Sequence, residues 1–93
     1  MIIGLMTVEC IIYDAHSLKE KRAVLQRITT RIKQKFNVSI SEVDYQDTWQ
    51  RTKLAVVTVA SVQTSCDAVI QQVQKFIDSF PEIERTITDL EWL

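Results

Sequence analysis

The spacing of apolar residues along the chain predicts alternating strands and helices. Residues 2–12 are apolar in both alternating sets except at Thr7 and Glu9, which is typical of a central strand. The period then changes to that of a helix of about five turns, which we expect to end at Asn37. The apolar stripe of this helix consists of Leu18, Leu25, Ile28, Ile32 and Phe36.

The middle of the chain has the pattern of a β-hairpin. Val38 and Ile40 begin a strand, but the apolar phase then slips to Val43 and Tyr45. One extra residue, a β-bulge, would account for that slip. A polar turn follows, and residues 53–62 are a third strand, rich in valine. Two strands this close in sequence are expected to pair antiparallel.

A second helix and a last strand complete the pattern. Thr64 and Asp67 match a capping box, so we expect a helix to open there and to end before Pro81. Its apolar stripe is formed by Val69, Val73, Phe76 and Phe80, flanked by Ile70 and Ile77. Residues 82–92 follow as a strand. The alternation assigns four of its side chains to two faces, Ile83 and Ile87 to one and Leu90 and Trp92 to the other.

This order of elements predicts an α+β fold of the ferredoxin-like βαββαβ type. Such a fold has a four-stranded antiparallel sheet with two helices on one face, and the 93 residues are enough for one domain spanning 1–93. The other face of the sheet is left open. Either Ile3, Leu5 and Ile11 or the opposite alternation would line it. A homodimer is the simplest cover for such an apolar patch.

Charge is unevenly distributed along a chain whose formal net charge is only −1. Residues 19–35 carry seven cations and one anion, whereas residues 67–93 carry six anions and two cations. The molecule is therefore expected to have a basic side and an acidic side, and the first helix belongs to the basic side.

The start of the first helix, residues 16–22, combines a helix signal with unfavourable charges. Ser17 and Glu20 form a capping box. Cations in the first turns of a helix oppose its dipole, at a cost of about 0.3–1 kcal/mol each. A helix N-terminus ringed by cations is also a ready phosphate site. The cations here are Lys19, Lys21 and Arg22.

Two interpretations of these cations stay open, an anion-binding site and a solvated surface. Lys21 points toward the apolar stripe, and we expect it to snorkel over the sheet edge. Lys33 and Arg51 are the supporting cations, although Lys33 also stabilises the helix C-terminus. Arg27 and Arg31 are expected on the solvated back of the helix. The predicted RNA- or phosphate-binding set is Lys19, Lys21, Arg22, Lys33 and Arg51.

The hairpin turn, residues 44–51, carries a second candidate contact. A tryptophan and an arginine beside a turn can stack on bases and contact phosphate, or anchor a protein partner. The alternative for Trp49 is that it folds back onto the core. His16, Tyr45 and Trp49 are accordingly the predicted partner or stacking contacts.

The sequence contains no catalytic, metal-binding or cofactor-binding motif. Gly4 is the only glycine, which excludes phosphate-cradling loops and dinucleotide fingerprints. His16 is the only histidine, and Cys10 and Cys66 lie far apart, so neither a zinc site nor a disulfide framework is indicated. We therefore expect no metal, no cofactor and no enzymatic activity. Glu9 in the first apolar segment argues against a signal peptide, and we expect a cytoplasmic protein that does not enter membranes.

Three linked motifs closely resemble the YlxP-like family, small bacterial proteins of unknown function. They are His-Ser-Leu-Lys-Glu-Lys-Arg at 16–22, Phe-Asn-Val-Ser-Ile-Ser-Glu-Val-Asp at 36–44 and Gln-Asp-Thr-Trp-Gln-Arg at 46–51. The resemblance implies a ferredoxin-like fold and an origin near genes for translation initiation and ribosome maturation. It implies no catalytic residue. This chain departs from the family pattern at Ala15, where members usually have glycine, and at Thr48, where they usually have an apolar residue.

Together these observations favour a non-enzymatic, cytoplasmic accessory protein. Its expected partner is the ribosome or another structured RNA, bound through the basic start of the first helix. The alternative is a homodimeric protein–protein interaction module that uses the open sheet face. A regulatory domain for a small ligand comes third, and nothing in the sequence names its ligand.

Overall fold

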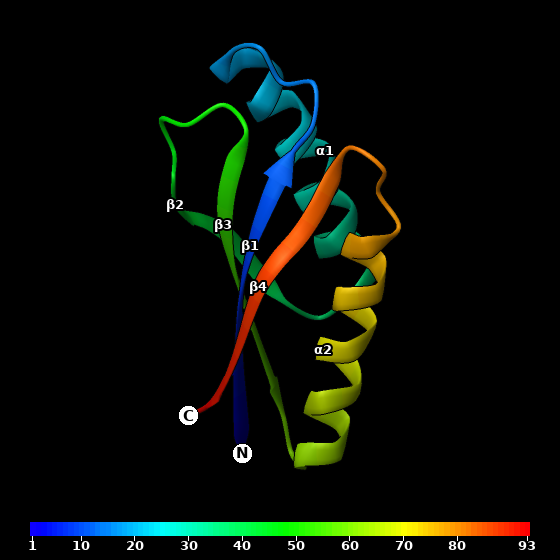
Figure 1. The fold of residues 1–93 in the computed structure, drawn as a ribbon. Coiled ribbons are helices and arrows are strands. Elements are labelled where there is room, and N and C mark those ends of the chain that lie inside the picture. The colour runs from blue at the N-terminus through cyan, green and yellow to red at the C-terminus, as the bar shows by residue number, and fades with distance from the viewer.

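The computed structural model describes residues 1–93 and has the predicted βαββαβ order (Figure 1). The four strands form one antiparallel sheet in the order β2-β3-β1-β4. The predicted ferredoxin-like fold class is therefore confirmed. The elements are β1 (Ile2–Ile12), α1 (Leu18–Lys35), β2 (Ser39–Asp44), β3 (Arg51–Ala60), α2 (Gln63–Asp78) and β4 (Ile83–Trp92).

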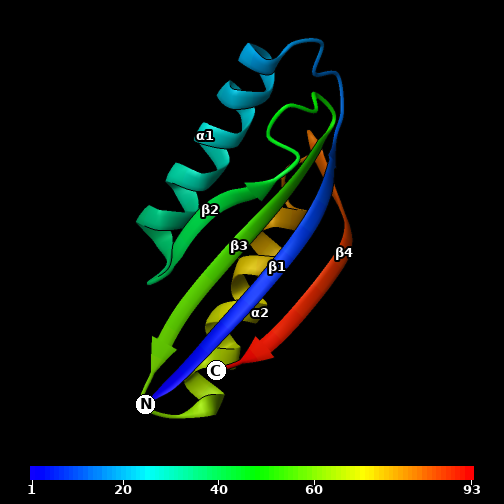
Figure 2. The ribbon, with the colours of Figure 1, turned by 90° about the vertical axis from the view of Figure 1, so that its left-hand side faces the viewer.

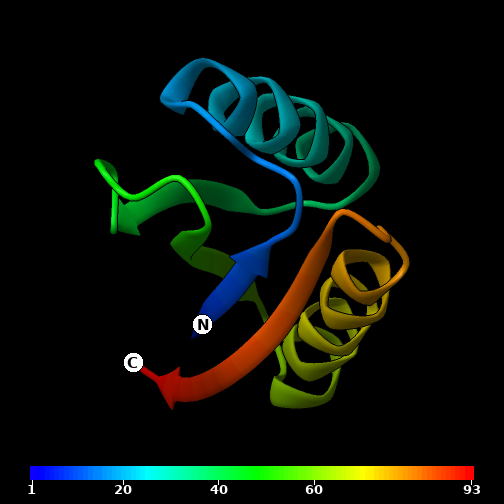
Figure 3. The same ribbon diagram turned by 45° about the horizontal axis from the view of Figure 1, so that its top comes forward.

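Both helices lie on the same side of the sheet, as Figure 3 shows. They do not cover it evenly. The first turns of α1 lie at the end where β2 turns into β3, whereas α2 begins at the opposite end, near both chain termini (Figures 1 and 2). The molecule is elongated, with extents of 42 × 21 × 17 Å. The α1 start and the β2–β3 turn therefore share one end of the molecule.

The core lies between the helices and one set of alternating strand residues. Alternate residues of β1 from Gly4 to Ile12 are buried, and the intervening ones are only partly so. This is the pattern of a strand that is covered on one face. The side chains that fill the core from both layers include Met6, Val8, Ile28, Ile32, Leu54, Val56, Ile70, Val73 and Ile77.

Two cysteines are part of this buried layer, and neither is in a disulfide. Burial raises the pKa of the Cys10 thiol to about 11. A thiol with so high a pKa stays protonated near neutral pH, and the thiolate is the reactive form. Cys10 is therefore a packing residue.

Several boundaries differ from the predicted ones. Helix α2 begins at Gln63, and its N-cap is Val62, which makes no side-chain capping bond. The predicted capping box of Thr64 and Asp67 is therefore wrong, because both residues are already inside the helix. Helix α1 ends at Lys35, just before the expected stop, and β3 begins two residues early because it extends its pairing with β1.

One predicted bulge is confirmed, and a second was missed. The pairing of β2 with β3 shifts between Glu42 and Asp44, so the phase slip in the sequence marked a real irregularity. The pairing of β1 with β4 also shifts, between Glu9 and Cys10. This shift places Ile83 in the core while Ile87 is exposed. The prediction that these two isoleucines share a face is therefore wrong.

Neither helix is long and apolar enough to cross a membrane.

Candidate nucleic-acid interface

The motifs singled out in the sequence meet at one end of the molecule. The side-chain amide of Gln50 donates to the carbonyl of Ala15 at 3.3 Å, which links the β2–β3 turn to the segment before α1. Lys21 in α1 reaches both the Tyr45 carbonyl, at 2.5 Å, and Glu42 of β2, at 2.9 Å. Segments 16–22, 36–44 and 46–51 are therefore neighbours in space although they are separate in sequence.

The predicted capping box at the start of α1 is confirmed. The Ser17 hydroxyl accepts from the Glu20 amide at 3.1 Å, and the His16 amide donates to the Glu20 carboxylate at 2.6 Å. The carboxylate of Glu20 therefore already occupies part of the positive end of the helix dipole. This internal anion reduces the attraction of the helix N-terminus for an outside anion.

Lys21 does not snorkel to solvent, and that prediction is wrong. Its side chain is 1% exposed, and its ammonium group binds the Glu42 carboxylate and the Tyr45 carbonyl. The same Glu42 oxygen accepts a hydrogen bond of 2.6 Å from the Thr52 hydroxyl. A buried charge is tolerated when it is paired and hydrogen-bonded. Lys21 therefore fastens α1 to the β2–β3 hairpin and is not available to an outside anion.

Arg51 lies on the opposite side of the sheet from the α1 cations. It is opposite Ile11 in the strand register, on the face that the helices do not cover. It forms a salt bridge of 3.0 Å with Glu9, and its guanidinium lies 4.3 Å from the centre of the Tyr45 ring. The structure therefore does not bring Arg51 together with Lys19 and the other cations of α1.

Arg22 and Lys33 lie on the same flank of α1, because residues eleven positions apart on an α-helix point in nearly the same direction. Both line an open groove of about 400 Å³ between α1 and the edge strand β2. Neither forms a salt bridge. Glu42 also lines this groove, but its carboxylate is already bound by Lys21 and Thr52. Lys19 is exposed in the first turn of the same helix.

The two arginines expected on the solvated back of α1 have partners in the fold. Arg27 forms a salt bridge with Glu82, which precedes β4. The guanidinium of Arg31 lies 5.8 Å from the centre of the Phe80 ring. These contacts hold α1 against the connection from α2 to β4. Their partners lie some fifty residues away in sequence, so the spacing of residues within the helix could not predict these contacts.

The tip of the hairpin exposes an aromatic ring. Trp49 is 50% exposed, so the alternative that it folds onto the core is wrong. With His16 it lines a hollow of about 490 Å³ on the surface. Asp47, Thr48 and Gln50 complete the lining. Tyr45 begins the turn with a φ of 62°, in the left-handed region that few non-glycine residues adopt. It stacks with Arg51 and is not part of this hollow.

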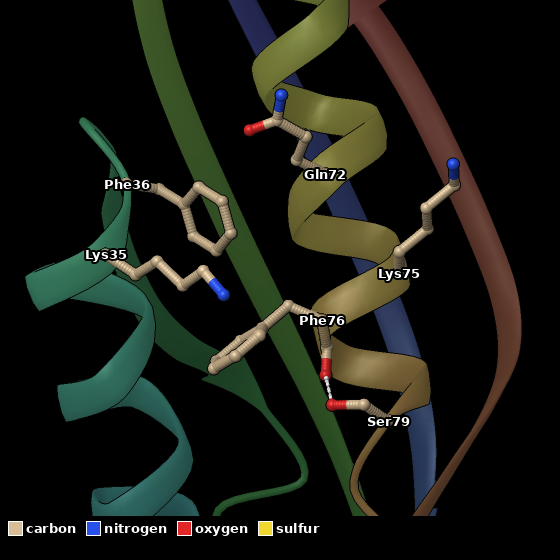
Figure 4. A pocket seen from close by; sticks show the side chains of 6 residues that line it. All are labelled: Lys35, Phe36, Gln72, Lys75, Phe76 and Ser79. Atoms are coloured by element: carbon tan, nitrogen blue, oxygen red, sulfur yellow. Dashed lines mark hydrogen bonds between the residues drawn. The ribbon is translucent and has the colours of Figure 1, made fainter.

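A second hollow, which sequence analysis missed, lies between the C-terminal halves of the helices. Its volume is about 380 Å³, and Figure 4 shows Lys35 directed between the rings of Phe36 and Phe76. The Lys35 ammonium lies 4.7 Å from the centre of the Phe76 ring, a cation–π contact. The two rings pack edge to face with their centres 5.6 Å apart. The aromatic rings therefore already hold the one lysine that points into this hollow.

The open face of the sheet carries an apolar patch near the chain termini. Leu5 pairs with Val57 and Ile3 with Val59 in the register of β1 and β3. Both valines are exposed. The predicted set of Ile3, Leu5 and Ile11 is therefore the one that faces away from the helices, and Figure 2 looks onto this face with α2 behind the sheet.

The fold and this surface define the chain as a ferredoxin-fold protein with a basic helix above the edge of its sheet. A family model described as "Protein of unknown function (DUF503)" matches residues 3–90. The chain is also 63% identical over 90 residues to the uncharacterized protein YlxP of Bacillus subtilis (strain 168), a match that covers 97% of this chain and 98% of that protein. The chain therefore belongs to the DUF503 family, and the resemblance to YlxP-like proteins is confirmed.

Two designed proteins of known structure share the fold. The de novo designed ferredoxin-fold protein LFR1 1 superposes with a TM-score of 0.57 at 12% identity, over 98% of this chain and 86% of the design. The de novo designed protein Foldit4 superposes with a TM-score of 0.55 at 7% identity, over 100% of this chain and 97% of the design. At such low identity the likeness concerns the fold alone.

Proposed function

We propose that this protein binds structured RNA, such as ribosomal RNA, in the cytoplasm through the exposed cations of α1. The supporting observation is the set of α1 side chains that form no salt bridge within the molecule. Of the seven cations between residues 19 and 35, only Lys21 and Arg27 are paired with a carboxylate. Those left without an ion pair are Lys19, Arg22, Arg31, Lys33 and Lys35.

The groove between α1 and β2 supports a phosphate backbone as the ligand. Arg22 and Lys33 lie in it eleven residues apart, which is roughly 16 Å along a helix that rises 1.5 Å per residue. A duplex can meet both cations along its backbone, and contacts of this kind set affinity and orientation without reading sequence.

The same surface supports a binding role over catalysis. Its side chains supply positive charge and amide or hydroxyl groups, and its one carboxylate, that of Glu42, is already bound by Lys21 and Thr52. The acidic residues of the C-terminal third would then repel RNA from the other parts of the surface and favour an approach from the α1 side. We infer an accessory factor that associates with RNA and does not change it chemically.

The triple variant Lys19→Gln, Arg22→Gln and Lys33→Gln removes three of the cations that are proposed to contact phosphate. Three phosphate contacts give a log–log salt slope of about −2.1 to −2.7, so wild-type affinity for an RNA hairpin is expected to fall roughly twentyfold to fortyfold between 50 and 200 mM salt. The triple variant should bind more weakly at 50 mM salt and should lose most of this slope. Fluorescence anisotropy of a labelled hairpin measures both quantities.

A matched control variant distinguishes the effect of where the charges lie from the effect of the total net charge on RNA affinity. Gln63→Glu, Thr64→Glu and Gln71→Glu change the net charge by the same three units, but on exposed positions of α2. This control should bind like the wild type apart from a small general repulsion. The proposal would be contradicted if the two triple variants lost RNA affinity equally, or if the affinity of the wild type did not depend on salt concentration.

A second candidate function is self-association through the open sheet face, which the exposed Val57 and Val59 favour. We propose a homodimer that buries this apolar patch, since exposed patches of this kind usually have a partner. Replacing Val57 and Val59 by lysine should then yield a monomer in light scattering after gel filtration. Val62→Lys is the control, because Val62 is equally exposed but lies beyond β3. A wild-type protein that is monomeric at millimolar concentration would exclude the dimer.

A further inference from the structure

The hollow between His16 and the hairpin tip differs in kind from the cationic groove. Its lining contains one exposed aromatic ring, one imidazole, one amide and one carboxylate, and no lysine or arginine. The hollow therefore offers no lysine or arginine side chain to bind a phosphate group. A flat, partly polar group would find a stacking surface in Trp49 and hydrogen-bonding partners in Asp47 and Gln50.

The backbone of the turn beside this hollow is held in place from several sides. The Ile12 amide donates to the Gln50 carbonyl at 2.9 Å, while the Gln50 side chain reaches Ala15. The Thr48 amide donates to the Tyr45 carbonyl at 3.0 Å, and that carbonyl also accepts from Lys21. The turn is therefore bound to β1 and to α1 at once. A turn whose backbone is already fixed costs less entropy when a ligand binds to it.

The hollow lies at the end of the molecule where α1 begins, and Lys19, one of the cations proposed to bind a phosphate backbone, belongs to the first turn of that helix. His16 lies immediately before the N-cap Ser17, and Lys19 is exposed in the first turn of α1. A nucleotide whose phosphates lie along α1 would thus bring its base within reach of the hairpin tip. A base inside a duplex is stacked and cannot enter such a hollow, whereas a base from a bulge or a loop can.

We propose that the hollow lined by His16 and Trp49 receives one unpaired base of the bound RNA. The base stacks on the exposed face of Trp49, and its polar edge meets the Asp47 carboxylate and the Gln50 amide. This inference rests on the proposed RNA binding and narrows it to structured RNA with an unpaired nucleotide. The four polar residues among the five that line the hollow favour a base over the apolar side chain of a peptide anchor.

The test compares two RNA hairpins of equal length, one fully paired and one with a single-nucleotide bulge. Trp92→Phe leaves Trp49 as the only tryptophan, so its fluorescence reports on the hollow. We expect the bulged hairpin to quench this emission and to bind about fivefold to a hundredfold more tightly, the range that base–aromatic stacking supplies. Affinities measured with the unmodified protein check that Trp92→Phe has not altered binding.

Trp49→Ala should bring the affinity for the bulged hairpin down to that for the paired one and leave the salt slope unchanged. Trp49→Phe should keep part of the preference. The inference is overturned if wild-type protein binds both hairpins equally, or if Trp49→Ala weakens both to the same extent. If neither hairpin binds, or if binding does not depend on salt, the proposed RNA binding is itself contradicted. The inference about the unpaired base is then contradicted as well.

Discussion

Lys21→Ala is expected to lower the free energy of unfolding by about 2–4 kcal/mol, more than any other change of a charged side chain considered for this protein. Removing one partner of a buried ion pair typically costs about 3–5 kcal/mol. The Glu42 side chain is 22% exposed, so water can solvate part of the carboxylate that is left behind, and we expect a loss about 1 kcal/mol smaller than that range. Urea unfolding followed by circular dichroism measures the change.

Two controls identify the ion pair as the cause. Lys19→Ala removes an exposed lysine from the same helical turn and should change stability by at most about 0.5 kcal/mol. In the double variant Lys21→Met and Glu42→Gln no charge is left unpaired, and the side-chain carbonyl at position 42 can still accept from the Thr52 hydroxyl, so stability should partly recover. A loss below about 1 kcal/mol in Lys21→Ala, or a double variant less stable than Lys21→Ala, would show that the pair does not hold α1 to the hairpin.

Gly4→Ala is expected to destabilise the protein by about 1–3 kcal/mol through overpacking. A methyl group at Gly4 would lie 2.7 Å from the Cδ1 atom of Ile70 and 2.9 Å from the sulfur of Cys66. Both neighbours are fully buried and cannot move without disturbing the core. Urea unfolding followed by circular dichroism measures this loss in the free energy of unfolding.

Ile70→Val supplies a matched test of this mechanism, because it removes the Cδ1 atom that the new methyl group would strike. Alone, Ile70→Val should cost about 0.5–1.5 kcal/mol. Combined with Gly4→Ala it should cost less than the sum of the two single changes, since the clash is relieved. Simple additivity, or a gain in stability from Gly4→Ala, would mean that the contact does not restrict position 4.

The element order could be predicted from the sequence because it depends on local periodicity. The apolar alternation of β1 and the helical stripe through Ile28 and Ile32 are both properties of short segments. The bulge in β2 was also visible, because it displaced an apolar phase between Ile40 and Val43. The extra residue of β4 lies between Ile83 and Ile87, whose spacing still fits regular alternation, and the apolar phase changes only later, between Ile87 and Leu90. Only the pairing of β4 with β1 determined the position of this bulge.

The candidate site was predicted in part. Arg22 and Lys33 share a groove because helical spacing places them on one flank, and that spacing can be read from the chain. Arg51 was misplaced because its face depends on the register of β3 with β1. The exposure of Trp49 could not be foreseen, since whether a turn residue packs inward depends on contacts that the whole fold makes.

The sequence by itself determined the βαββαβ order, the capping box that opens α1 and the concentration of positive charge on that helix. Each of these arises from residues within a few turns or a few strand positions of one another. Only the tertiary structure decided which cations are exposed. Lys21 meets Glu42 and Arg27 meets Glu82 across long stretches of chain, because packing α1 on the sheet brings carboxylates to some lysines and arginines and leaves others facing water.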